Sequence, residues 1–171
     1  MAPDRLGVLI GAVFGLIYVV VNAGELDAPA GSLLQGLGVL AFVGVLAALW
    51  RGHARPSGDR VGRGGFGRGY QLVVVAEVIA IIAGIAALNG PLDLEDGVLP
   101  WVSLVVGTHF LALAWVWRAP SLVWTGAGIA LLGAIGLGLA AGDASKATIA
   151  AVAGIGPGAL LLAGSLWAAT R

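Results

Sequence analysis

Six apolar runs, each close to twenty residues long, are the feature that most constrains how this chain can fold. About 20 residues of α-helix cross ~30 Å of hydrocarbon, and a helix satisfies its own backbone hydrogen bonds there. A spanning β-barrel needs polar residues at alternate positions of its strands, and the runs lack that alternation. We therefore predict an all-α integral membrane bundle of six transmembrane helices that forms a single domain over residues 1–171. The predicted helices are residues 6–21, 32–50, 70–88, 98–117, 121–141 and 147–169.

The composition agrees with insertion into a membrane. Only 11% of the residues are charged and 59% are apolar, whereas a soluble domain carries about 25% charge. There is no cysteine, so disulfides, thiolate metal sites and cysteine nucleophiles are excluded. We expect a multi-pass protein of a plasma membrane, the inner membrane of a bacterium, with membrane lipids around it and no cofactor.

Charge is distributed unequally between the loops, and this predicts the orientation. With the N-terminus inside, the inner loops and termini receive eight of the nine basic residues, and the outer turns receive six of the nine acidic ones. The positive-inside rule then places both termini in the cytoplasm. The inner basic residues are Arg5, Arg51, Arg55, Arg60, Arg63, Arg68, Arg118 and Arg171. The outer acidic residues are Glu25, Asp27, Asp93, Glu95, Asp96 and Asp143. Five tryptophans lie toward the inner side, namely Trp50, Trp115, Trp117, Trp124 and Trp167.

The cytoplasmic basic loop, residues 51–69, is the one sizeable loop. Its sequence RGHARPSGDRVGRGGFGRG resembles arginine–glycine segments that bind RNA electrostatically. The positive-inside rule already explains why this loop is rich in arginine, and arginines there would also contact anionic lipid head groups. We therefore expect a flexible loop and no nucleic-acid partner.

Small residues at four-residue spacing predict close packing of two helices. These ridges are Gly7, Gly11 and Gly15 in the first run, and Ala134, Gly138 and Gly142 in the fifth. The first run follows a basic residue and precedes the A-x-A-like residues 28–30, so a signal peptide is an alternative. Its glycine ridge favours a retained helix, which packs either within the chain or in a homo-oligomer.

Two ionisable residues, Glu77 and His109, lie near the middle of the third and fourth runs. Glu77 is two residues, ~3 Å at helical rise, to the inner side of the centre of its run, and His109 is at most two residues to the inner side of its own. Helices joined by a short turn are normally antiparallel neighbours. We therefore predict that both side chains share one depth and meet if their helix faces agree.

A charged group at the middle of a bilayer costs ~2.5–3.5 kcal/mol, so this pair needs an explanation. Glu77 is protonated and hydrogen-bonded, or ion-paired with protonated His109, or solvated in a wet cavity, and the sequence does not choose among these states. As a functional site the pair would handle protons or bind a substrate. As a structural contact it would hold two helices together, for which such bonds contribute only ~0.6 kcal/mol on average.

Three further residues complete the candidate ligand-binding set: Thr108, Tyr18 and Pro157. Proline lacks a backbone N–H and clashes with the carbonyl four residues earlier, so Pro157 predicts a kink in the last helix. Such a break lines a binding cavity in some transporters, and otherwise it is a glycine-padded packing feature. We expect no metal site, because one histidine and one carboxylate are too few ligands.

The segments FGRGYQLVVVAE (66–77) and PWVSLVVGTHFLALA (100–114) together resemble a family of small multispanning bacterial membrane proteins of uncharacterised function. In that family an intramembrane glutamate precedes a VGxHF helix, represented here by Val106, Gly107, His109 and Phe110. The resemblance covers about the middle third of the chain. It implies no particular activity.

Three functions are compatible with these residues. The leading hypothesis is binding or translocation of a small solute or proton at a midplane site that contains Glu77 and His109. The second is a membrane-embedded enzyme for a lipophilic substrate, in which the pair would be catalytic as a general acid and base. The third is a structural subunit without chemistry. A wet cavity would indicate transport, an apolar pocket open to lipid would indicate an enzyme, and a hydrogen-bonded pair without a void would indicate a structural role.

Overall fold

The computed structural model describes residues 3–51 and 67–170, and every regular element in these ranges is helical. Most of the predicted basic loop, residues 52–66, lies outside the described ranges. The long helices are α1 (Pro3–Asn22), α2 (Ala30–Trp50), α3 (Arg68–Asn89), α4 (Val98–Trp117) and α5 (Ser121–Ala141). The last span has three parts, α6 (Lys146–Ala150), the π-helical turn η3 (Ala151–Ile155) and α7 (Gly156–Thr170). The short turns η1 (Ala23–Glu25) and η2 (Glu95–Gly97) precede α2 and α4.

The predicted six spans are confirmed as helices, since six helical segments of the described chain are long and apolar enough to cross a membrane. The fourth and fifth have the predicted bounds, and the others differ by a few residues at their ends. At α2 the helix begins at Ala30, directly after Pro29, whose backbone angles (φ −90°, ψ −5°) already lie in the right-handed helical region.

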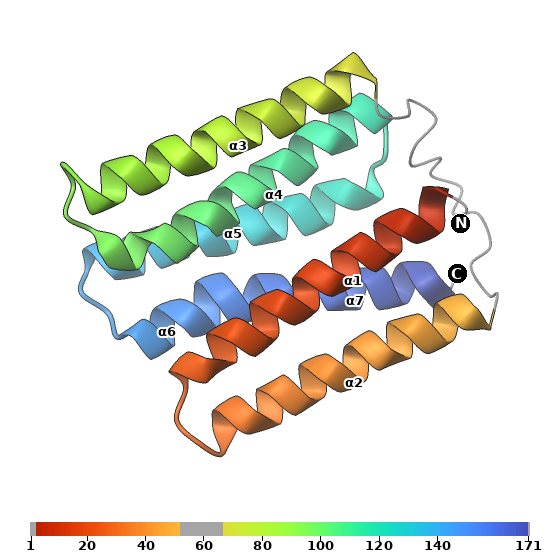
Figure 1. Cartoon of the computed structure of the whole chain (residues 1–171), viewed down its shortest axis with the longest axis horizontal. Helices are drawn as coiled ribbons and strands as arrows, with labels where there is room; N and C mark the ends of the chain where they lie inside the picture. Colours follow the sequence, from red (N-terminus) through yellow and green to blue (C-terminus); the bar gives the residue numbers. More distant parts are fainter. Residues whose placement is uncertain (1–2, 52–66, 171) are drawn as a thin grey trace.

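The helices form two groups, visible in the lower and upper halves of Figure 1. The lower group is α1, α2 and α7, and the upper group is α3, α4 and α5. The last span contacts both groups, because η3 packs against α1, α4 and α5. In the upper group, α4 and α5 make the most extensive contact, and α3 packs mainly on α4.

Glycines allow the closest helix contacts, although only one of the two predicted ridges makes them. A side chain at Gly15 would lie 2.9 Å from the Gly158 carbonyl oxygen, and one at Gly11 would lie 2.9 Å from Ser165 Oγ, so this part of the ridge on α1 packs within the chain against α7. The ridge is wrong at Gly7, which has open space around it. The predicted ridge on α5 is wrong at Gly138, which has open space around it. Instead Gly126 and Gly133, on another face of α5, meet the backbone of α4. Small-residue spacing marks candidate faces, but it does not say which one has a neighbouring helix.

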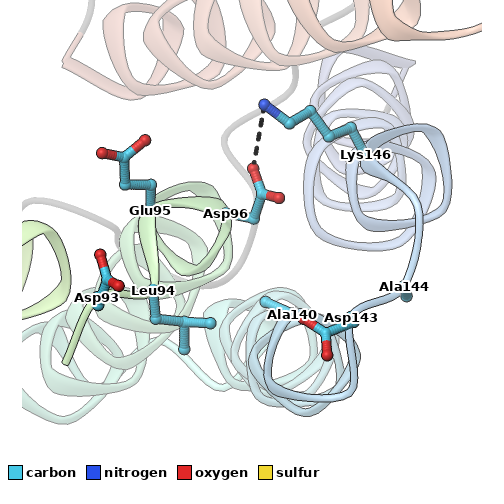
Figure 2. A pocket seen from close by; sticks show the side chains of 8 residues that line it. All are labelled: Asp93, Leu94, Glu95, Asp96, Ala140, Asp143, Ala144 and Lys146. Atoms are coloured by element: carbon cyan, nitrogen blue, oxygen red, sulfur yellow. Dashed lines mark ion pairs between the residues drawn. The ribbon is translucent and has the colours of Figure 1, made fainter.

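The two ends of the bundle differ in chemistry. The start of α1, the end of α2, the start of α3 and the end of α7 lie at one end of the bundle, on the right of Figure 1. Exposed tryptophans gather at this basic end, with Trp50, Trp115 and Trp124 each more than four-fifths exposed. The opposite, acidic end carries the turns η1, η2 and α5–α6. Figure 2 shows the carboxylates there, where Asp96 forms an exposed ion pair of 3.4 Å with Lys146.

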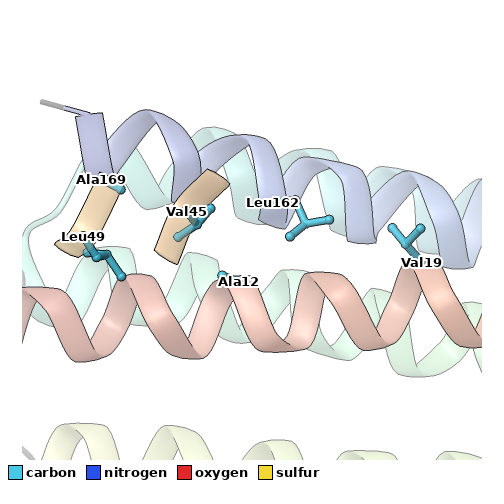
Figure 3. Packing of buried hydrophobic residues seen from close by; sticks show 6 residues of the cluster. All are labelled: Ala12, Val19, Val45, Leu49, Leu162 and Ala169. Atoms are coloured by element: carbon cyan, nitrogen blue, oxygen red, sulfur yellow. The ribbon is translucent and has the colours of Figure 1, made fainter. Parts of the chain in front are cut away.

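One cluster of buried apolar side chains lies between the helices of the lower group, and further buried apolar residues, such as Val105, Leu113 and Ile129, lie in the upper group. Figure 3 shows six small or branched side chains that interlock between α1, α2 and α7. They are Ala12, Val19, Val45, Leu49, Leu162 and Ala169. Outside this core, α3 is a peripheral helix, since Leu72, Ile79 and Ile82 on it are more than three-fifths exposed. The candidate site therefore lies at the edge of the bundle and not in its core.

Candidate functional site

Glu77 and His109 meet across the interface between α3 and α4. Glu77 Oε2 lies 2.9 Å from His109 Nδ1, and the exposed fractions of the two side chains are 19% and 14%. Antiparallel packing of the two helices brings these positions to the same height, as predicted from their distances to the centres of the two runs. Adjacency and matching faces are thus observed, while the role of the pair stays a prediction.

The contact has the distance of an ion pair without the alignment of a hydrogen bond. His109 Nδ1 is buried and makes no hydrogen bond of good geometry among the described residues. The Phe110 ring packs edge-on against the imidazole, with ring centroids 5.9 Å apart and planes at 85°. The imidazole is therefore held by packing as much as by Glu77, and a small rotation of either side chain would align or break the polar contact.

Aromatic contacts on both sides of the pair hold α3 against α4. Toward the acidic end, the Trp101 indole donates from Nε1 to the Ala80 carbonyl over 3.0 Å. It lies across Gly84, where any side chain would collide with the ring. Toward the basic end, Tyr70 and Trp117 stack with centroids 5.9 Å apart. The Glu77–His109 contact thus occurs in an interface that is fixed at both ends.

Pro157 produces the predicted irregularity, which takes the form of the π-helical turn immediately before it. Because proline has no N–H, the carbonyl four residues earlier, that of Ala153, loses its α-helical donor. Ser103 on α4 replaces that donor, with its Oγ 2.6 Å from the Ala153 oxygen and its side chain fully buried. The proline therefore creates an acceptor in the core, and a serine from the other helix group satisfies it.

Tyr18 belongs to this second polar group and does not contact the Glu77–His109 pair directly. Its hydroxyl lies 3.5 Å from Ser103 Oγ. A serine hydroxyl has one proton, and the shorter contact to Ala153 uses it, so Tyr18 is the donor that remains for Ser103. We call Tyr18, Ser103 and Ala153 the Ser103 cluster. It joins α1, α4 and η3, and thus both helix groups.

Sequence reasoning missed Ser103, although a signal for it exists. A proline inside a buried helix leaves one carbonyl without a donor, so a hydroxyl on a neighbouring helix is needed to satisfy it. Ser103 is a polar residue in the otherwise apolar first half of α4. Choosing it required knowing that α4, and not another helix, faces η3.

Thr108 makes a hydrogen bond within its own helix and not to Glu77 or His109, and its part in ligand binding stays a prediction. Its side chain is exposed, and its hydroxyl donates to the Val105 carbonyl of its own helix over 2.8 Å. Pro157 also lies apart from the pair, since it is fully buried beside the Ser103 cluster. Of the five candidates, Glu77 and His109 contact each other. Tyr18 and Pro157 both lie beside Ser103, and Thr108 belongs to neither group.

Two surface pockets lie at the ends of the bundle, and Glu77 and His109 line neither of them. One, of about 350 Å³, is at the acidic end between Asp93, Asp143 and Lys146 (Figure 2). The other, of about 300 Å³, is on α3 at the basic end. Among the described residues, no group of three or more histidine or acidic side chains is placed to hold a metal ion. In comparisons with protein families, curated proteins and solved structures, nothing matches this chain.

Proposed function

We propose that this chain is a small multi-pass membrane protein that binds a proton at the Glu77–His109 pair, as a step in translocating protons or a small solute. The observation that carries the proposal is the direct 2.9 Å contact between two titratable side chains in mostly apolar surroundings. Because the two groups already touch, a small rotation of either side chain is enough for a proton to be shared between them. A larger solute that bound both would first have to separate them.

The proton balance of the pair explains why it suits this task. With one proton, the pair is either carboxylate and imidazolium or carboxylic acid and imidazole, and both forms have no net charge. Removing that proton, or adding a second, gives the pair a net charge of one unit. A net charge is costly in an apolar medium, so each such step favours the compensating movement of another ion. This coupling is the physical basis of proton-driven transport.

The orientation that accompanies this proposal has the basic end in the cytoplasm. Arginines at that end follow the positive-inside rule, and the exposed tryptophans suit the interface between membrane and water. In this orientation, protons would pass between the cytoplasmic and external faces of the membrane along the interface between α3 and α4.

Infrared difference spectroscopy of the purified protein in lipid nanodiscs tests the proton site. We expect a carboxyl stretching band that appears on acidification and is missing in Glu77→Gln. Asp96→Asn, which removes an exposed carboxylate at the acidic end, is the matched control and should retain the band. Vesicles that contain the protein and an internal pH dye should show proton flux that Glu77→Gln abolishes. Unchanged spectra and unchanged flux in Glu77→Gln would disprove the proposal.

A structural role is the second candidate. It is favoured by the peripheral position of α3 and by the fact that the pair lines neither of the two pockets. This helix packs mainly on α4. One polar contact in that interface therefore contributes a larger fraction of the helix's packing energy than it would for a helix in the core. If Glu77→Gln changes only thermal stability, and neither proton uptake nor flux, the pair is structural.

A further inference from the structure

A groove on the outer face of α3 lies at the basic end of the bundle. Arg68, Gln71, Leu72 and Val75 line its cavity of about 300 Å³. These positions follow the spacing of one helix face, so they form a continuous stripe along α3. All four side chains are exposed. The groove faces away from α4 and from the Glu77–His109 pair, so it is independent of the proton site.

The stripe changes from charged to apolar over the depth at which a bilayer changes in the same way. From Arg68 to Val75 the helix rises by ~10 Å, and the head-group region of one leaflet is about 5–8 Å thick. The Tyr70–Trp117 stack and the exposed Trp115 mark the same level with aromatic rings, which favour the membrane interface. Given membrane insertion, Arg68 and Gln71 lie among head groups while Leu72 and Val75 lie among acyl chains.

Arg68 is an exposed cation at the start of α3. Neither ion pair among the described residues involves it. The acidic turns lie at the opposite end of the bundle from the start of α3 (Figure 1). Guanidinium binds phosphate oxygens through paired N–H donors, and the Gln71 amide adds another donor one turn further along the same face.

We propose that this groove binds one anionic phospholipid of the leaflet at the basic end. Its phosphate contacts Arg68, its head group contacts the Gln71 amide, and one acyl chain lies along Leu72 and Val75. Arg118 provides the comparison, because it is also exposed at the basic end but does not line the groove. If the groove forms a specific site, removing Arg68 weakens lipid binding more than removing Arg118. If anionic lipid is only attracted to basic residues in general, the two removals have the same effect.

Native mass spectrometry of the full chain in neutral detergent, titrated with phosphatidylglycerol or phosphatidylcholine, tests the proposal. We expect tighter binding of phosphatidylglycerol and a loss of about fivefold in its affinity for Arg68→Gln, the ratio that corresponds to ~1 kcal/mol per basic residue at a membrane surface. Arg118→Gln is the matched control and should bind like the parent protein. Leu72→Trp, which fills the groove and keeps the charge, should also weaken binding.

Three results would overturn the proposal. Equal losses in Arg68→Gln and Arg118→Gln would show diffuse attraction without a site. Equal binding of phosphatidylcholine would remove the role of the anionic charge. Full competition by inorganic phosphate would show an anion site that does not use the apolar stripe. Circular dichroism and size-exclusion chromatography of each variant ensure that a loss of binding is not a loss of fold.

Discussion

At the scale of single residues, the contribution of the Glu77–His109 contact to stability is bracketed by two general values. Breaking a buried ion pair in a soluble protein costs about 3–5 kcal/mol, because one charge is left unpaired. Polar contacts between helices in a membrane contribute only ~0.6 kcal/mol on average. The pair is mostly buried but lacks the alignment of a hydrogen bond. Its energetic contribution therefore depends on whether both groups are charged.

A double-mutant cycle with Glu77→Gln and His109→Gln measures this contribution. We expect a coupling energy of about 1–3 kcal/mol if the pair is ionised, because each single variant then leaves one charge without its partner. Reversible unfolding in mixed detergent micelles gives the four free energies of unfolding. Leu72→Ala, at an exposed position on α3, is the control for a change that touches neither residue. A coupling energy near zero would mean that the two groups touch in their neutral forms.

At the scale of elements, the last span shows how one proline shapes a helix and its neighbour. Pro157 withholds an N–H from Ala153, the local backbone widens into a π-helical turn, and Ser103 supplies the missing donor from α4. An irregularity before Pro157 was predictable, because it follows from the chemistry of proline alone. Its partner was not, because that depends on which helix lies beside η3. Gly138 illustrates the same limit, since four-residue spacing does not distinguish an occupied helix face from an open one.

Substituting both members of this arrangement tests the explanation. Ser103→Ala should lower the free energy of unfolding by about 1–3 kcal/mol, because it leaves the buried Ala153 carbonyl without a donor. In a Pro157→Ala background the same substitution should have a smaller effect, since the new N–H at position 157 can bond to that carbonyl. Thermal unfolding followed by circular dichroism measures both. Equal losses in the two backgrounds would contradict the link between Pro157 and Ser103.

At the scale of the whole molecule, the sequence predicts the six spans because apolar length and backbone satisfaction leave few alternatives. It does not predict the division into two helix groups. That arrangement depends on which glycines meet a neighbouring backbone, such as Gly15 against α7 and Gly133 against α4. The same loop charges that predict the topology also give the bundle one basic and one acidic end.

The orientation can be checked directly, because the chain has no cysteine of its own. Gly142→Cys places a thiol at the acidic end, and Gly67→Cys places one at the basic end, both at exposed positions. In intact cells, a membrane-impermeant maleimide should label the first variant and not the second. Permeabilised cells should give labelling of both, which controls for thiol reactivity. The reverse pattern would place the basic end outside.

The packing of α1 against α7 has a consequence for how the bundle assembles during synthesis. The first helix of the chain finds its main partner in the last one, and the buried core between them also includes α2. While the ribosome produces the four spans in between, the glycine face of α1 has no partner from its own chain. Completion of this core must therefore wait for the final span. By contrast, α3, α4 and α5 follow one another in sequence and can pack in the order in which they emerge.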